Sequence, residues 1–99
     1  MKIIFLNGKK MICRADAHLY IKNKLKFPDY YGENLDALWD LLSTTSDAIQ
    51  ILLFNRDYIE KSLGEYGNSL IKVFQEAAHE NNKVSFKILN ITNKPQRLG

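Results

Sequence analysis

Acidic side chains gather in one stretch of the chain, and they are the residues best placed to do chemistry. Residues 29–47 contain no lysine or arginine. Their acidic residues are Asp29, Glu33, Asp36, Asp40 and Asp47. On a helix, Asp36, Asp40 and Ser43 share one face, because they are separated by four and then three residues. Two carboxylates one turn apart can bind cationic groups of another protein, ligate Mg²⁺ or Ca²⁺, or take part in acid–base catalysis.

The enzyme and metal interpretations find little support. Asp36, Asp40 and Glu76 could form a carboxylate cluster, but no nucleophile or histidine accompanies them. His18 and His79 lie far apart without a partner at zinc-ligand spacing, and we expect both on the surface of helices. Neither a G-x-G-x-x-G nor a Walker A pattern occurs. The sequence therefore predicts no metal, no cofactor and no catalytic activity.

Two aromatic residues and a glycine come just before the acidic helix face. Tyr30, Tyr31 and Gly32 combine large, partly polar contact surfaces with a residue that allows a sharp turn, as a binding edge requires. An ordinary solvated acidic face explains the carboxylates equally well from the pattern alone. The adjoining tyrosines favour a protein-binding surface.

The distribution of charge argues against nucleic acid as the direct partner. The net charge is +3 and the predicted pI is about 9.0. Residues 1–28 hold seven lysines and arginines against one aspartate, whereas residues 29–47 have a net charge of −5. The basic third lacks interleaved aromatic residues apart from Tyr20 and Phe27, so a solvated helix face explains it more simply than an RNA site does.

The apolar pattern predicts the elements that position these residues. Ile3–Leu6, Ile49–Phe54 and Val84–Leu89 read as strands, the first two as buried ones. A first helix is expected after an N-cap at Asp16, and a second begins near Glu33 or Asn34. The second helix turns Leu35, Leu38, Trp39 and Leu42 inward.

Two further helices complete the predicted fold. A short helix spans 57–63, and a long one reaches Glu80 after a loop flanked by Gly64 and Gly67. Strands separated by helices imply right-handed crossovers and a parallel sheet. We expect an α/β domain over residues 1–91, with three parallel strands covered by about four helices, and a loose tail over 92–99.

Size and composition fit one cytoplasmic domain. The single cysteine, Cys13, cannot form an internal disulfide, and we expect it at a strand end or in the core. The apolar start of the chain is too short for a signal peptide, and no run is long enough to cross a membrane. No second apolar face is evident in the sequence, so we expect a monomer when the protein is free.

These residues together resemble the barstar family. The run PDYYGENLDALWD at 28–40 is highly specific, and it follows a strand, an Asn-Gly turn and a helix with Asp16-Ala17-His18. VFQEA near residue 75 adds to the resemblance, which spans about residues 1–90. Barstar-like proteins are intracellular inhibitors of secreted, guanyl-preferring ribonucleases of the barnase type. The resemblance implies a 1:1 complex that blocks the ribonuclease active site.

The resemblance also implies a set of partner-binding residues. Asp40 would enter the phosphate-binding pocket of the ribonuclease, Asp36 would pair with a second basic group, and Tyr30 would lie against the catalytic histidine. Glu76 would make a peripheral ion pair. The full set of expected partner-binding residues is Tyr30, Tyr31, Gly32, Asn34, Asp36, Trp39, Asp40, Ser43 and Glu76.

Two departures from the family pattern concern the net charge, which is +3 although the best-known member is strongly acidic, and the end of the acidic helix. Thr44-Thr45 stands where the best-known member has Gly-Trp, which removes an aromatic side chain from the edge of the expected contact. The alternative is an immunity protein or antitoxin against a different basic nuclease toxin, because an acidic helix serves equally well against any basic, phosphate-binding active site.

Overall fold

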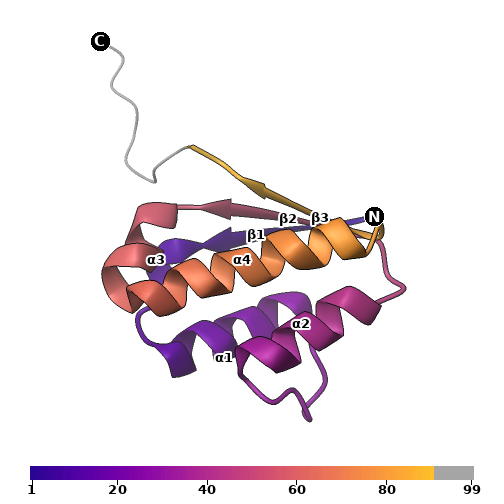
Figure 1. Ribbon diagram of the computed structural model, residues 1–99, viewed down its shortest axis with the longest axis horizontal. Coiled ribbons are helices and arrows are strands. Elements are labelled where there is room, and N and C mark those ends of the chain that lie inside the picture. The colour runs from indigo at the N-terminus through magenta and orange to yellow at the C-terminus, as the bar shows by residue number, and fades with distance from the viewer. Residues whose placement is uncertain (91–99) are drawn as a thin grey trace.

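The computed structural model describes residues 1–90, and its elements follow the order expected from the apolar pattern (Figure 1). The strands and helices are β1 (Lys2–Asn7), the 3₁₀ helix η1 (Gly8–Lys10), α1 (Arg14–Leu25), α2 (Leu35–Thr44), β2 (Ile49–Phe54), α3 (Arg56–Leu63), α4 (Glu65–Glu80) and β3 (Val84–Ile88). The predicted tail at 92–99 lies outside the described residues.

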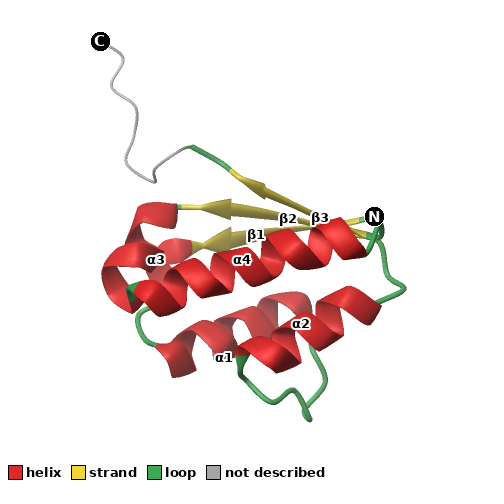
Figure 2. Ribbon diagram, viewed as in Figure 1, coloured by secondary structure: helices red, strands yellow, loops and turns green. Residues whose placement is uncertain are grey.

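The three strands form one parallel sheet in the order β1-β2-β3, with helices between them in the chain (Figure 2). Ile4 pairs with Ile51, which pairs in turn with Phe86, so apolar side chains from all three strands share one face. The predicted α/β architecture with three parallel strands and four α-helices is confirmed.

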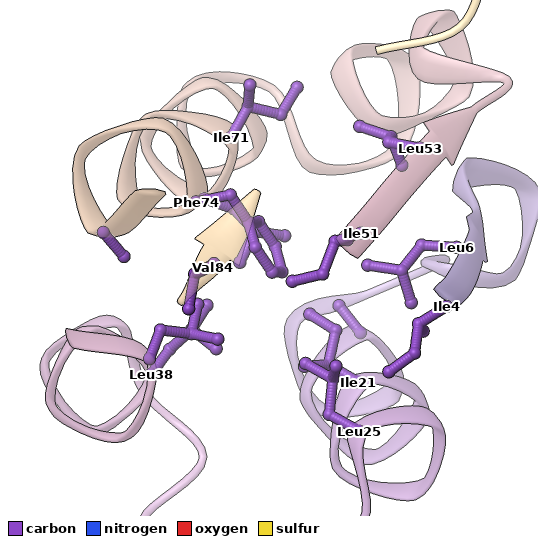
Figure 3. Packing of buried hydrophobic residues seen from close by; sticks show 14 of the residues in the cluster. Ile4, Leu6, Ile21, Leu25, Leu38, Ile51, Leu53, Ile71, Phe74 and Val84 are labelled. Carbon is purple, nitrogen blue, oxygen red and sulfur yellow. The ribbon is translucent and has the colours of Figure 1, made fainter. Parts of the chain in front are cut away.

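The hydrophobic core lies between that face and the helices (Figure 3). α1 lies along β1 and α4 along β3, whereas α2 packs mainly on α4. Ile21 of α1, Leu38 of α2 and Phe74 of α4 are buried and point toward the strand side chains. Only Asp36, Asp40 and Thr44 of α2 are exposed, so one face of this helix remains available to a partner.

The opposite face of the sheet is open, which differs from the expectation of buried strands. Ile3 and Phe5 of β1 are 57% and 49% exposed, and they alternate with buried Ile4 and Leu6. Phe5 stands in register with Leu52, which pairs with exposed Lys87. The continuous apolar runs predicted burial on both faces. The helices instead pack on one face, so the premise that the molecule has no second apolar face was wrong.

Three local predictions also need correction. α1 begins at Arg14, so Asp16 lies in its first turn instead of capping it, and Cys13 at the N-cap position is exposed. Gly67 is buried inside α4, not at the end of a loop. A β-carbon there would lie 2.7 Å from Ile59 Cγ2, so Gly67 is needed where α3 and α4 meet. Within residues 1–90, no helix is both long and apolar enough to cross a membrane.

Candidate protein-binding site

Hydrogen bonds fix both ends of α2, the helix that carries the acidic face. At its start, the Asn34 side chain accepts from the Ala37 backbone N–H at 2.7 Å, which confirms the predicted beginning of this helix. At its end, the Asn81 amide donates to the carbonyls of Leu42 and Thr45 at 2.9 and 3.0 Å. Because Asn81 closes α4, the end of α2 is held by the helix on which it packs.

The loop before α2 takes its sharp turn at Glu33, not at Gly32 as the sequence suggested. Glu33 has a φ of 53°, in the left-handed region, whereas Gly32 does not. The reason for a glycine at position 32 is steric, because a β-carbon there would lie 3.3 Å from the side-chain amide nitrogen of Asn34. The Tyr31 N–H also donates to the Pro28 carbonyl at 3.0 Å, which closes a turn around Tyr30.

The exposed face of α2 carries carboxylates without cationic partners. Asp36 and Asp40 are exposed and Ser43 is half-buried. Residues 1–90 contain two salt bridges, Lys22–Asp29 and Lys72–Glu76, and neither involves Asp36 or Asp40. A pair of solvated carboxylates with no internal partner is available to cations supplied by another molecule.

Tyr30 stands beside this face and reaches far into solvent. Its side chain is 80% exposed, and Tyr30, Gly32 and Asp40 line one open groove of about 270 Å³. An exposed tyrosine next to an unpaired carboxylate can contact the flat side of an aromatic or imidazole ring while the carboxylate binds a cation. The loop and the helix therefore form one continuous surface.

A second groove extends the surface onto α4. Trp39 packs partly against the core, and its remaining surface lines a groove of about 330 Å³ with Glu76 and His79. Glu76 is exposed and lies 4.0 Å from Lys72, a weak pairing at an exposed site. The predicted dual role of Trp39, core packing with an outward edge, agrees with this placement.

Tyr31 and His18 are placed differently from the sequence expectation. Tyr31 is only 5% exposed and packs on Phe27, with ring centroids 4.9 Å apart. His18, expected on the surface, is 1% exposed, and its ring nitrogens lie 2.6 Å from the Tyr31 hydroxyl and 2.7 Å from the Tyr66 hydroxyl. Burial lowers the pKa of His18, and nearby Glu33 partly opposes this effect. Tyr31 is thus mostly buried, although it contributes to the lining of the groove that contains Tyr30 and Asp40.

Comparison with known proteins agrees with this geometry. The family model described as "Barstar (barnase inhibitor)" matches residues 1–90. The "Putative ribonuclease inhibitor YrdF" of Bacillus subtilis (strain 168) is 40% identical over 90 residues, which cover 90% of this chain and 98% of that protein. The chain belongs to the barstar family.

The surface of this barstar family member contains most of the residues expected to bind a partner. The exposed or half-exposed ones that lie together on α2, its preceding loop and α4 are Tyr30, Gly32, Asn34, Asp36, Trp39, Asp40, Ser43 and Glu76. Tyr31 lines the same groove as Tyr30, Gly32 and Asp40, but it is only 5% exposed. Within the described part of the chain, no three His, Cys, Asp or Glu side chains are grouped so that they could hold a metal ion.

The position of the two threonines also distinguishes this chain within the barstar family pattern. The Thr44 hydroxyl donates to the Asp40 carbonyl at 2.7 Å, so Thr44 belongs to the last turn of α2. Thr44 and Thr45 line a cavity of about 200 Å³ with Phe27 and Leu41, on the side of α2 away from Trp39. The side of α2 that carries Thr44 is therefore hollowed next to the segment that contains Phe27.

Proposed function

We propose that this chain is an intracellular protein inhibitor, not an enzyme, and that its target is a barnase-type, guanyl-preferring ribonuclease. The inhibitor would bind in a 1:1 complex and cover the ribonuclease active site with α2 and the loop that contains Tyr30. Both the family match over residues 1–90 and the name of the Bacillus relative support ribonuclease inhibition. No catalytic group of this chain takes part, since inhibition requires only that RNA be excluded.

Asp40 is the anchor of this proposal. Its carboxylate presents two oxygens with the geometry of a phosphate oxygen pair, and arginine binds such a pair through two parallel hydrogen bonds. A ribonuclease already holds its cationic groups in place for the phosphate of RNA, so the inhibitor meets a preorganised anion site. Desolvating the pair strengthens the attraction further.

The remaining contacts would orient the inhibitor around Asp40. Asp36 would pair with a second basic group, Tyr30 would stack on the catalytic histidine, and Glu76 would make an ion pair at the edge. Trp39 would contribute the outward side of its indole ring. Together these side chains cover the loop, α2 and α4, which gives the contact its breadth.

One observation carries the proposal: Asp36 and Asp40 are exposed on one helix face and form no salt bridge within residues 1–90, directly beside an exposed Tyr30. Like charges one turn apart destabilise a helix by roughly 0.2–0.5 kcal/mol, partly offset for Asp36 by the helix dipole. Binding to another molecule explains why both carboxylates are present although they destabilise the helix.

The test is a titration of a barnase-type ribonuclease with the protein, measured as RNA cleavage. We expect stoichiometric inhibition, and Asp40→Asn, which keeps the shape but loses the charge, should raise the inhibition constant by about 10³-fold or more. The size of this loss is carried over from the barstar family, whose anchoring aspartate is a known hot spot. Asp57→Asn, an exposed change at the start of α3, is the matched control and should inhibit normally.

Either negative result has a clear meaning. Inhibition that survives Asp40→Asn would show that Asp40 is not the anchor of the complex. A folded protein that does not inhibit at all would exclude the barnase-type target and favour the alternative, another basic nuclease toxin.

A further inference from the structure

A positive charge lies beside the carboxylates of the proposed binding surface, on the side chain of Arg14. This residue begins α1, and it lines an open groove of about 520 Å³ together with Glu33, Asp36 and Tyr66. Asp36 thus belongs both to this groove and to the acidic face of α2. A molecule that is bound by Asp36 therefore also meets Arg14.

Contact with an aromatic ring positions the Arg14 side chain. Its guanidinium carbon lies over the Tyr66 ring, 4.2 Å from the ring centre, where the negative face of the ring attracts a cation. The Tyr66 hydroxyl lies 2.7 Å from Nε2 of buried His18, so the ring itself is tied to the interior. Burial raises the pKa of the Tyr66 hydroxyl and the charge of Arg14 partly opposes this effect, in agreement with the short contact. Arg14 is therefore held in place before any partner binds.

The hydrogen-bond donors of this guanidinium group remain unused. Arg14 is exposed, and within residues 1–90 its side chain makes neither a hydrogen bond nor a salt bridge, even with Glu33 and Asp36 of the same groove. An arginine that rests on an aromatic ring can still bind a carboxylate through two parallel hydrogen bonds. A fixed cation with free donors is suited to bind an anionic group of another molecule.

The surroundings of Arg14 favour a single carboxylate over a polyanion. The groove is lined by the first turns of α1, α2 and α4, and the start of a helix carries a positive partial charge. No side chain caps α1 or α4, which leaves their first N–H groups without a side-chain acceptor. Glu33 and Asp36 line the other side of the groove and repel a chain of phosphates such as RNA. A protein edge that carries an acidic and a basic side chain next to each other fits both signs of charge.

We propose that Arg14 is a specificity-determining residue, which binds a carboxylate of the target ribonuclease next to the basic group that pairs with Asp36. This inference rests on the proposed function and adds to it a requirement on the target. A ribonuclease with only basic groups at this place is repelled by Arg14, whereas one with an acidic and a basic group side by side is held by both Arg14 and Asp36. Arg14 thus distinguishes among ribonucleases that offer the same phosphate-binding pocket to Asp40.

The first experiment titrates a barnase-type ribonuclease with the Arg14→Gln protein and measures RNA cleavage. We expect the inhibition constant to rise by about 5- to 20-fold, because a charge-assisted contact at the edge of the interface is lost. Arg56→Gln is the matched control, since Arg56 is exposed at the start of α3 and does not line the groove. Both variants lose one positive charge, so long-range attraction changes alike, and the control should stay within about twofold of the wild type.

The second experiment identifies the carboxylate that Arg14 binds. Each aspartate and glutamate at the edge of the ribonuclease active site is replaced singly by its amide, and binding is measured by titration calorimetry because some of these changes also reduce RNA cleavage. We expect one ribonuclease variant that binds the wild-type inhibitor more weakly and is not weakened further by Arg14→Gln. Such a loss of additivity is the signature of a direct contact between the two changed side chains.

A third experiment tests whether the Tyr66 ring holds Arg14 ready for binding. Tyr66→Phe and Tyr66→Leu both remove the hydroxyl next to His18, but only phenylalanine keeps an aromatic ring under the guanidinium group. Arg14→Gln should weaken inhibition as much in the Tyr66→Phe protein as in the wild type. In the Tyr66→Leu protein its effect should fall to less than about twofold, because a mobile arginine loses more conformational entropy on binding.

The outcomes separate this inference from the proposed function. A wild type that inhibits the ribonuclease while Arg14→Gln inhibits as well as Arg56→Gln, or better, would overturn the role of Arg14 and leave the proposed function in place. A complete set of ribonuclease amide variants without coupling to Arg14→Gln would overturn it too. A folded wild type that inhibits no barnase-type ribonuclease would instead refute the proposed target, and the inference about Arg14 with it.

Discussion

At the scale of single residues, the proposed binding surface is distinguished by polar groups that have no partner within residues 1–90. Asp36 and Asp40 form no salt bridge within residues 1–90, whereas the interior polar groups His18 and Asn55 are hydrogen-bonded. Buried polar atoms require such partners, and no buried side-chain nitrogen or oxygen atom of the described residues lacks one. The unpaired carboxylates on the surface therefore stand out against a fully satisfied interior.

The two carboxylates should not contribute equally. Asp36 lines a groove with Arg14 and Tyr66, so the positive charge of Arg14 opposes a cation that approaches there. Asp40 has no basic residue among those lining its groove. We expect Asp36→Ala to weaken inhibition by about 10- to 100-fold, clearly less than Asp40→Ala, as measured by titration against RNA cleavage. A larger loss for Asp36 would mean that it is the anchor.

The sequence predicted the exposure of these carboxylates, because it follows from helix spacing. Asp36, Asp40 and Ser43 had to lie apart from the Leu38 and Leu42 stripe, and they do. We expected His18 on the surface because histidine is polar, although its position in the helix indicated burial. It precedes buried Ile21 and Leu25 by three and seven residues, the spacing of one helix face, so the signal for burial was present. Its partners, Tyr31 and Tyr66, come from segments that no local pattern connects.

At the scale of elements, strand and helix identities were predictable from apolar periodicity, but the way the elements meet was not. The expected loop between Gly64 and Gly67 is absent because α3 ends at Leu63 and α4 begins at Glu65. Gly64 alone makes the corner, with a φ of 59° that favours glycine. Gly67 looked like a loop residue because glycine is rare within helices, and only the contact with Ile59 explains it.

This close approach predicts a stability effect. A β-carbon at position 67 would lie 2.7 Å from Ile59 Cγ2 and 2.8 Å from its carbonyl oxygen, so α3 would have to shift. Alanine favours a helix over glycine by about 1 kcal/mol, but overpacking costs roughly 1–3 kcal/mol, and we expect Gly67→Ala to reduce the free energy of unfolding by about 1 kcal/mol. Urea denaturation measures this change.

A matched substitution on the same helix supplies the control. Asn68 is exposed, and Asn68→Ala should leave the free energy of unfolding unchanged or raise it by a few tenths of a kcal/mol. A Gly67→Ala protein as stable as Asn68→Ala would show that α3 yields easily, and that the glycine is not required by packing.

At the scale of the whole molecule, the sheet separates two very different surfaces. Helices and the core cover one face, and the proposed binding surface lies beyond them on α2 and α4. The other face exposes Ile3 and Phe5. The sequence could not show this asymmetry, because β2 is apolar at almost every position although its residues alternate between buried and half-buried. An apolar run shows that a strand can be buried on both faces, but the packing of the helices decides which face is covered.

The open face of the sheet could bind a second copy of the chain, but its small area and the charge of Lys87 disfavour such a dimer. Three strands of five or six residues present roughly 250 Å² on one face, well below the approximately 800 Å² per partner of a stable interface. Lys87 stands exposed in register with Leu52, so a second copy packed on this face would have to desolvate its ammonium group. We therefore predict a monomer, although for a different reason from the absence of an apolar face.

Removing the positive charge of Lys87 should allow the protein to associate with itself through the open face of the sheet. Lys87→Leu would extend the apolar row of Phe5 and Leu52 across β3, and we expect association that increases with protein concentration, measured by sedimentation velocity. Lys83→Leu, an exposed change just before β3, adds the same side chain outside the sheet and should remain monomeric. If both variants stay monomeric, the small area of the face is sufficient to prevent pairing. A wild type that already dimerises would contradict the predicted monomer.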